Sequence, residues 1–96
     1  MHLNDLRDQA FYNAQIKGFH DPRKEFGTSL MLVVAELAEA LEADRIGDNN
    51  LLREEIADVF ILLGNLCGEH KIDIDMEVER KMKINAGRPA KHGKKY

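Results

Sequence analysis

The sequence predicts an all-α protein. Apolar residues recur at helical spacing through most of the chain, only 2 of the 96 residues are proline, and polar or glycine-containing segments near residues 18, 47 and 87 separate the periodic stretches. A chain of this length can enclose one modest core. We therefore expect one domain over residues 1–96, with residues 87–96 as a basic C-terminal tail, built as a four-helix antiparallel arrangement that is completed by oligomerisation.

The first helix is expected to begin at Asn4, whose side chain can cap it, and to end at Gly18. A loop should follow as far as about Gly27, because Pro22 disfavours helical geometry at the residue before it.

The second helix is expected to start at about Ser29, with Thr28 or Ser29 as its cap, and to end at Arg45 before Gly47. Its apolar stripe is expected to consist of Leu30, Val34, Leu37 and Leu41. Glu36 and Glu39 are three residues apart, which separates them by only about 60° around the helix axis. We therefore place these two carboxylates side by side, next to the stripe.

The third helix is expected from about Leu51 to Glu69, capped by Asn49 or Asn50. Its apolar face is so broad that other elements must cover most of its sides. Because the turn before it is short, helices two and three should be antiparallel neighbours. Their acidic pairs, residues 36 and 39 and residues 55 and 58, lie at similar distances from that turn. The four carboxylates should therefore meet.

A fourth helix is expected to begin at a cap formed by Asp73 or Asp75 and to run to about Asn85. The glycine and proline at residues 87 and 89 should stop it. Its inward residues are expected to be Ile74, Val78 and Met82.

The composition predicts a soluble domain in a reducing compartment of the cell. Hydrophobic residues make up 44% and charged residues 32% of the chain, which is typical of a folded soluble domain. The single cysteine, Cys67, precludes an internal disulfide framework, so a cytoplasmic location is expected. The chain begins without the basic and apolar pattern of a signal peptide, and its apolar runs are far shorter than the ~20 residues of a membrane span. We expect no membrane partner.

Charge is strongly segregated although the net charge is only −3. Residues 36–58 contain eight acidic and two basic residues, whereas residues 80–96 contain seven basic residues and none that is acidic. A basic tail alone is compatible with nucleic-acid binding, but the acidic middle would repel phosphates unless a metal intervened. We therefore expect no nucleic-acid partner.

Four carboxylates within apolar helices point to a bound cation, because an unpaired buried carboxylate costs several kcal/mol. One Glu-x-x-Glu motif is usually a solvated helix face, but two acidic pairs at matching heights favour a metal. An all-oxygen ligand set suits Mg²⁺ or Mn²⁺ rather than Zn²⁺. The expected metal ligands are Glu36, Glu39, Glu55 and Asp58.

The basic C-terminal segment would complement such a site. Lys81 and Asn85 share a face of the fourth helix, and Arg88 and Lys94 follow. Protein-bound Mg²⁺ commonly holds substrate phosphates, and basic side chains can neutralise the other side of a triphosphate. On its own, a basic terminus is more often a solvated tail, so this interpretation depends on the acidic site.

These motifs together resemble the MazG-like, all-α nucleoside triphosphate pyrophosphohydrolases. The family's Glu-x-x-Glu and Glu-x-x-Asp motifs match residues 36–39 and 55–58. Its C-terminal Lys–Asn–Arg-Pro and His-Gly-Lys signature matches residues 81–89 and 92–94. The chain departs from the pattern at His20, where relatives often have an aromatic residue, commonly Trp, and at Ala35, where some have another Glu.

The resemblance implies Mg²⁺-dependent hydrolysis of a nucleoside or deoxynucleoside triphosphate to the monophosphate and pyrophosphate, as house-cleaning of nucleotide pools. It implies a homodimer or homotetramer. It further implies that Glu36 or Glu39 is the general base, and that the phosphates are bound by Lys81, Asn85, Arg88 and Lys94.

Several alternatives stay open at this point. A dUTP diphosphatase and a phosphoribosyl-ATP pyrophosphohydrolase would share the scaffold and the acidic motifs. A non-catalytic helical assembly module would instead pair its carboxylates with Lys or Arg across a subunit interface.

Overall fold

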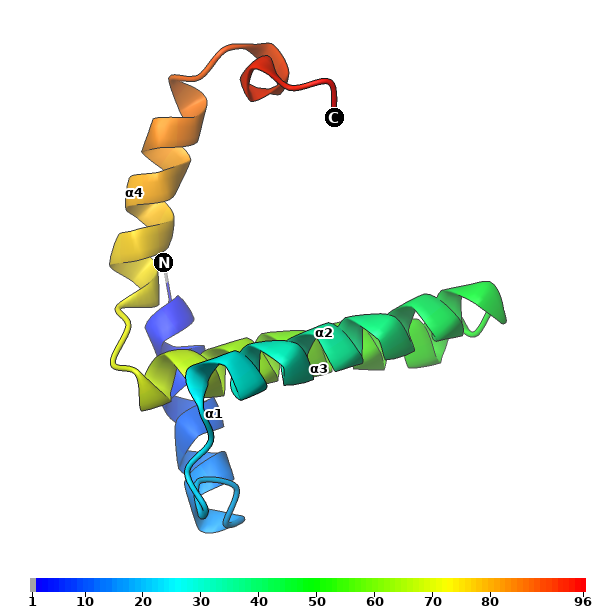
Figure 1. Ribbon diagram of the computed structural model, residues 1–96, viewed down its shortest axis with the longest axis vertical. Helices are drawn as coiled ribbons and strands as arrows, with labels where there is room; N and C mark the ends of the chain where they lie inside the picture. Colours follow the sequence, from blue (N-terminus) through cyan, green and yellow to red (C-terminus); the bar gives the residue numbers. More distant parts are fainter. Residues whose placement is uncertain (1) are drawn as a thin grey trace.

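The computed structural model describes residues 2–96, and this range contains helices and no strand (Figure 1). The elements are α1 (Leu3–Ile16), α2 (Phe26–Arg45), α3 (Asn49–Glu69), α4 (Ile74–Ala86) and a short 3-10 helix, η1 (Ala90–Gly93). The all-α prediction is therefore confirmed. None of the helices in residues 2–96 has the length and apolar character needed to cross a membrane.

Helices α2 and α3 lie side by side and antiparallel, as predicted from the short turn between them (Figure 1). Gly47 adopts the left-handed conformation in this turn, with φ of +76°. Asp48, rather than Asn49 or Asn50, caps α3, since its carboxylate accepts a hydrogen bond of 3.0 Å from the Leu51 backbone N–H. The helix consequently begins two residues earlier than expected.

Helix α2 turns a different face toward α3 than its pattern predicts. Val33, Ala40 and Ala43 are buried, whereas the predicted stripe is 42–50% exposed at Leu30, Val34, Leu37 and Leu41. The predicted apolar stripe is therefore half-exposed within one chain. The physical reason is size: alanines let two helix backbones approach closely, which leaves the row of larger side chains on the outside.

The start of α2 also differs from expectation. The helix begins at Phe26, and neither Thr28 nor Ser29 caps it. The backbone carbonyl of Glu25 accepts a hydrogen bond of 3.1 Å from the Ser29 N–H, so helical bonding begins one turn before the predicted cap.

Helix α1 crosses α3 at the end of the hairpin that is farthest from the turn (Figure 1). The crossing occurs at Gly64 and Gly68, where an added methyl group would crowd against atoms of α1. A Cβ on Gly64 would lie 3.3 Å from the Ala10 Cβ, and one on Gly68 only 2.7 Å from the Phe11 Cβ. Glycine at both positions is therefore what permits the close packing of α1.

The first turns of α1 and α4 hold each other through a reciprocal cap. The Asp75 carboxylate accepts hydrogen bonds from the backbone N–H groups of Leu3 and Asn4, at 2.8 and 3.4 Å. In return, the Asn4 side-chain oxygen accepts a bond of 2.9 Å from the Ile74 N–H. The prediction that Asn4 caps its own helix is wrong, because its side chain caps α4 instead.

Asp73 is the N-cap of α4, as predicted, and its carboxylate accepts a hydrogen bond of 3.0 Å from the Met76 N–H. The Asn4 side-chain amide also donates to Asp73, at 2.9 Å. The carboxylates of residues 73 and 75 therefore lie where two helix N-termini meet, and negative charge is favourable there.

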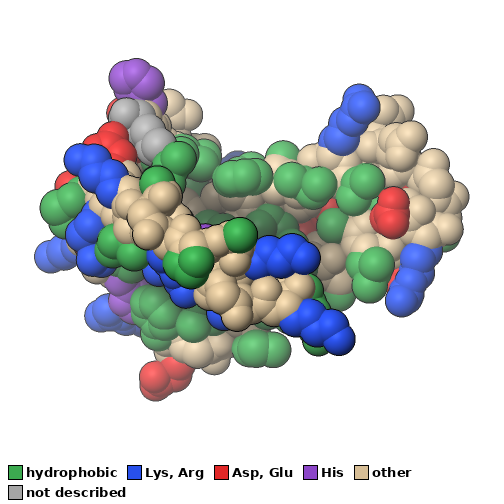
Figure 2. All heavy atoms as spheres, turned by 90° about the horizontal axis from the view of Figure 1, so that it is seen from above, with side chains coloured by type: hydrophobic (Ala, Val, Ile, Leu, Met, Phe, Trp, Pro, Cys, Tyr) green, Lys and Arg blue, Asp and Glu red, His purple; other side chains and the backbone are tan. Residues whose placement is uncertain are grey.

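Helix α4 rises away from the α2–α3 hairpin, and its main contacts are with α1 (Figure 1). Ile74 and Val78 are half-buried, but Met82 is 56% exposed, so its predicted inward orientation is wrong within one chain. The molecule is open, and large apolar side chains are exposed on each of α1 to α4. Figure 2 shows many apolar side chains at the surface of one face. Among residues 2–96, the only large apolar side chains that are buried are Val33 and Leu66, which keep 8% and 4% exposure.

Candidate metal centre

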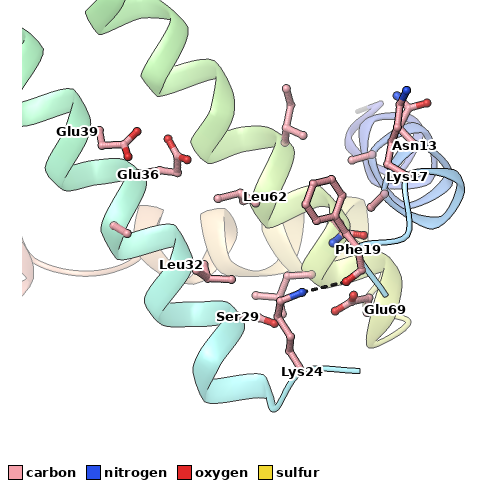
Figure 3. Close-up of a pocket in the computed structure, with 16 residues that line it drawn as sticks. Asn13, Lys17, Phe19, Lys24, Ser29, Leu32, Glu36, Glu39, Leu62 and Glu69 are labelled. Carbon is pink, nitrogen blue, oxygen red and sulfur yellow. Dashed lines mark hydrogen bonds between the residues drawn. The ribbon is translucent and has the colours of Figure 1, made fainter. Parts of the chain in front are cut away.

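Three of the four predicted carboxylates meet between α2 and α3. Glu36 and Glu39 from α2 and Glu55 from α3 each place a carboxylate oxygen within 4.8 Å of the others. Figure 3 shows the first two projecting from successive turns of α2 toward α3. The matched distances from the turn, which motivated the prediction, account for this meeting. We call these three residues the carboxylate cluster.

The carboxylate cluster has little internal compensation for its charge. The Oε2 atoms of Glu36 and Glu55 are buried and have no hydrogen-bond partner in the described chain. The adjacent Glu36 carboxylate, desolvation and the neighbouring Glu39 carboxylate together raise the pKa of Glu55 from 4.5 to about 7. No Lys or Arg among residues 2–96 forms an ion pair with the cluster.

This arrangement fits a hard divalent cation. Carboxylate oxygens are the ligands that Mg²⁺ and Mn²⁺ prefer, and two buried oxygens without donors are the atoms that a cation would satisfy. The ligand set contains no nitrogen or sulfur, which disfavours Zn²⁺. The residues present are therefore suited to the predicted metal.

Asp58 lies outside the carboxylate cluster. It follows Glu55 by one turn of α3, and its side chain is exposed. The structure thus brings three of the predicted ligands together, and ligation by Asp58 stays a prediction.

The predicted phosphate-binding residues lie on α4 and beyond it, away from the cluster. Lys81, Arg88 and Lys94 are exposed, and Asn85 is half-buried, with a buried side-chain oxygen that has no hydrogen-bond partner in the described chain. None of the four lines the cavity beside Glu36 and Glu39. Within one chain, the acidic and basic halves of the predicted site do not meet.

A cavity of about 640 Å³ adjoins the carboxylate cluster (Figure 3). It lies where α1, α2, α3 and the α1–α2 loop come together, and its walls are mostly apolar, as in typical small-molecule sites. Glu36 and Glu39 lie at one end, and Asn13 and Lys17 of α1 at the other (Figure 3). The remaining polar lining residues are Lys24, Ser29, Asn65 and Glu69.

His20, from the loop between α1 and α2, supports this cavity. Its Nε2 lies 2.7 Å from the Asn65 side-chain oxygen and 3.2 Å from the Glu69 carboxylate, and its Nδ1 contacts the Gln15 side chain. Its ring also packs on Phe11, with centroids 4.7 Å apart. The loop is thereby fixed to both α1 and α3.

Sequence reasoning missed Asn65 as a cavity residue. The available signal was its position, since Asn65 is the only strongly polar side chain in the apolar run of residues 59–67. A polar side chain in such a run needs a partner, and here that partner is His20.

No protein-family description matches this chain, and neither the curated proteins nor the solved structures contain a match.

Proposed function

We propose that this protein is a Mg²⁺-dependent, MazG-like nucleoside triphosphate pyrophosphohydrolase. It would convert a nucleoside or deoxynucleoside triphosphate to the monophosphate and pyrophosphate, as house-cleaning of nucleotide pools. The observation that carries the proposal is the carboxylate cluster with two unpartnered buried oxygens, next to a cavity of about 640 Å³. That volume lies in the range of small-molecule sites.

The roles follow from the chemistry of each side chain. Glu36, Glu39 and Glu55, with Asp58 as the predicted fourth ligand, would hold the cation. When bound, Mg²⁺ would supply charge stabilisation on phosphate oxygens and a more acidic water. The protein's own contribution is a proton acceptor for the attacking water, which we assign to Glu36 or Glu39.

We further propose that the chain works as a homodimer or homotetramer. The exposed row of Leu30, Val34, Leu37 and Leu41 on α2 supports this, as does the limited cover on α4. Large exposed apolar patches mark interaction surfaces. In an assembly, a second copy would bring its Lys81, Asn85, Arg88 and Lys94 toward the phosphates. Sedimentation equilibrium tests this, and a monomer at micromolar concentration would contradict it.

The deciding experiment is a panel of nucleoside triphosphates, each incubated with Mg²⁺ and assayed for pyrophosphate. We expect turnover in the wild type, and its loss in Glu36→Gln with the helical circular dichroism retained. Glu42→Gln is the matched control, since Glu42 is exposed and pairs with Arg45. Absence of turnover with every nucleotide, in Mg²⁺ and in Mn²⁺, would refute the proposal.

The same panel separates the related enzymes. Strict preference for dUTP would indicate a dUTP diphosphatase, and strict preference for phosphoribosyl-ATP would indicate that pyrophosphohydrolase.

The exposed apolar face also supports a second candidate function, a non-catalytic assembly module. In such a module the carboxylates would pair with Lys or Arg of another subunit. It would give no heat on calorimetric titration with Mg²⁺ and a non-hydrolysable triphosphate, whereas the enzyme would bind both.

A further inference from the structure

We propose that the cavity beside Glu36 and Glu39 holds the base of the nucleotide, and that Asn65, oriented by His20, makes it favour bases with an exocyclic carbonyl over adenine. The assignment of a nucleotide as ligand rests on the proposed function. The selectivity for the base rests on the contacts that His20 makes with Asn65 and Glu69.

The first step is the placement of the base. The cavity opens at the carboxylate cluster, where the phosphates would lie, and continues past Leu62 and Phe19 toward Asn13 (Figure 3). Its walls are largely apolar, which suits a planar heterocycle. The side-chain amides of Asn13 and Asn65 are polar groups that can meet a base edge there.

The second step is the orientation of the Asn65 amide. Glu69 can only accept a hydrogen bond, and its carboxylate lies 3.2 Å from the His20 Nε2. The Gln15 side chain contacts the other ring nitrogen, Nδ1, and its amide can either accept or donate a hydrogen bond there. Because two acceptors face Nε2, we assign the proton to that nitrogen, which then donates to the Asn65 Oδ1 at 2.7 Å. With its oxygen engaged by the imidazole, Asn65 has its NH₂ group left for a ligand.

The third step is the match to the base. Asparagine binds adenine by accepting from the exocyclic amino group while donating to the ring N7. An Asn65 whose oxygen already accepts from His20 presents donors instead, and these would face adenine's own donor. Bases with an exocyclic carbonyl offer an acceptor at that edge. Asn65 is thus the specificity-determining residue, and His20 is a positioning residue.

The experiment measures base selectivity without phosphate or metal. Isotope-labelled wild-type protein is titrated with inosine and adenosine, and the Asn65 side-chain NH₂ resonance is followed. The two nucleosides differ at C6, which bears a carbonyl in inosine and an amino group in adenosine, and at N1, which is protonated only in inosine. We expect inosine to bind roughly five- to tenfold more tightly, as expected for one hydrogen bond gained and one donor clash avoided. Uridine should also bind, and it should shift the same resonance.

Three variants sharpen the test. Asn65→Asp replaces donors with acceptors, so it should reverse the preference toward adenosine. His20→Ala frees the Asn65 amide to rotate, so it should bring the two affinities within about twofold of each other. Asn50→Asp is the matched control, because Asn50 is exposed at the far end of the hairpin, and its selectivity should equal that of the wild type. If Asn65→Asp does not fold, Asn65→Leu should bind both nucleosides about equally.

The outcomes separate this inference from the proposed function. Equal affinity of the wild type for inosine and adenosine, no binding at millimolar concentration, or an unchanged preference in Asn65→Asp overturns the inference even if pyrophosphate is released. Selective inosine binding that reverses in Asn65→Asp supports the inference even where no triphosphate is hydrolysed, and the hydrolase proposal alone then fails.

Discussion

Replacing Gly68 with alanine is expected to destabilise the fold by forcing α1 away from α3. A Cβ at this position would lie 2.7 Å from the Phe11 Cβ and 3.0 Å from its Cγ and Cδ2. Carbon atoms in contact prefer about 3.5–4.0 Å. Because the Phe11 Cβ is attached to the α1 backbone, a change of rotamer cannot move it. The two helices must therefore separate by about 1 Å.

The magnitude follows from two opposing effects. Overpacking a tight contact costs about 1–3 kcal/mol, and the rigid backbone contact at Gly68 favours the upper half of that range. Alanine in a helix gains about 1 kcal/mol over glycine. The net loss in the free energy of unfolding should be about 1–2 kcal/mol, which lowers Tm by roughly 4–16 °C in a domain of this size.

Gly27→Ala is the matched control, since a Cβ there would have no neighbour within 4 Å. It should raise the free energy of unfolding by about 0.4–1 kcal/mol. Both variants and the wild type are compared by urea unfolding followed by circular dichroism, at equal protein concentration. A Gly68→Ala protein as stable as the wild type, or more stable, would show that the Gly64–Gly68 crossing is not closely packed.

Three further results are expected. In metal-free protein, the stability that Glu55 contributes through its raised pKa should be present below about pH 4.5 and lost as pH rises through about 7. Thermal unfolding in EDTA should therefore show a fall in Tm over that window that is missing in Glu55→Gln. A parallel fall in Tm in both proteins would contradict the raised pKa. Asn4→Ala should lower the free energy of unfolding by about 1–2 kcal/mol, because it leaves the Ile74 N–H at the start of α4 without its acceptor. Exposed Asn50→Ala should change it by less than about 0.5 kcal/mol, and equal effects in denaturant titrations would count against the reciprocal cap. Glu36→Gln should weaken Mg²⁺ binding by roughly tenfold or more, and Asp58→Asn should weaken it less, since the exposed Asp58 lies outside the carboxylate cluster. If calorimetry shows a larger loss of affinity in Asp58→Asn, Asp58 is the dominant ligand.

The helices themselves could be predicted because their signals are local. The glycine and polar residues of the turn at 47–50 and the cap at Asp73 act within a few residues, and the structure contains both features. The meeting of Glu36 with Glu55 followed from counting residues away from a tight turn. Local chemistry and the length of the hairpin were sufficient for these features.

Features that depend on distant residues could not be predicted in the same way. Asn4 satisfies the general preference for a helix cap, but its partner is α4, which begins 70 positions away. The periodicity of α2 identifies an apolar row at Leu30 and Leu37 without saying whether the same chain or another molecule covers it. The small residues Ala40 and Ala43 decide the packing, because backbone approach outweighs side-chain hydrophobicity at that contact.

The cavity was harder still to predict. Asn65 becomes a cavity residue only because the α1–α2 loop places His20 against α3. Loop geometry of this kind depends on three-dimensional contacts from both helices, which no single stretch of sequence carries.

The reciprocal cap has a consequence for the order in which the protein opens and closes. It joins residues 69 to 72 positions apart, whereas the α2–α3 hairpin forms around a turn of a few residues. Closing the longer loop costs more chain entropy, so the hairpin should form first and the cap last. In native-state hydrogen exchange, the first turns of α1 and α4 should therefore lose protection together, as one opening unit that precedes the opening of the hairpin.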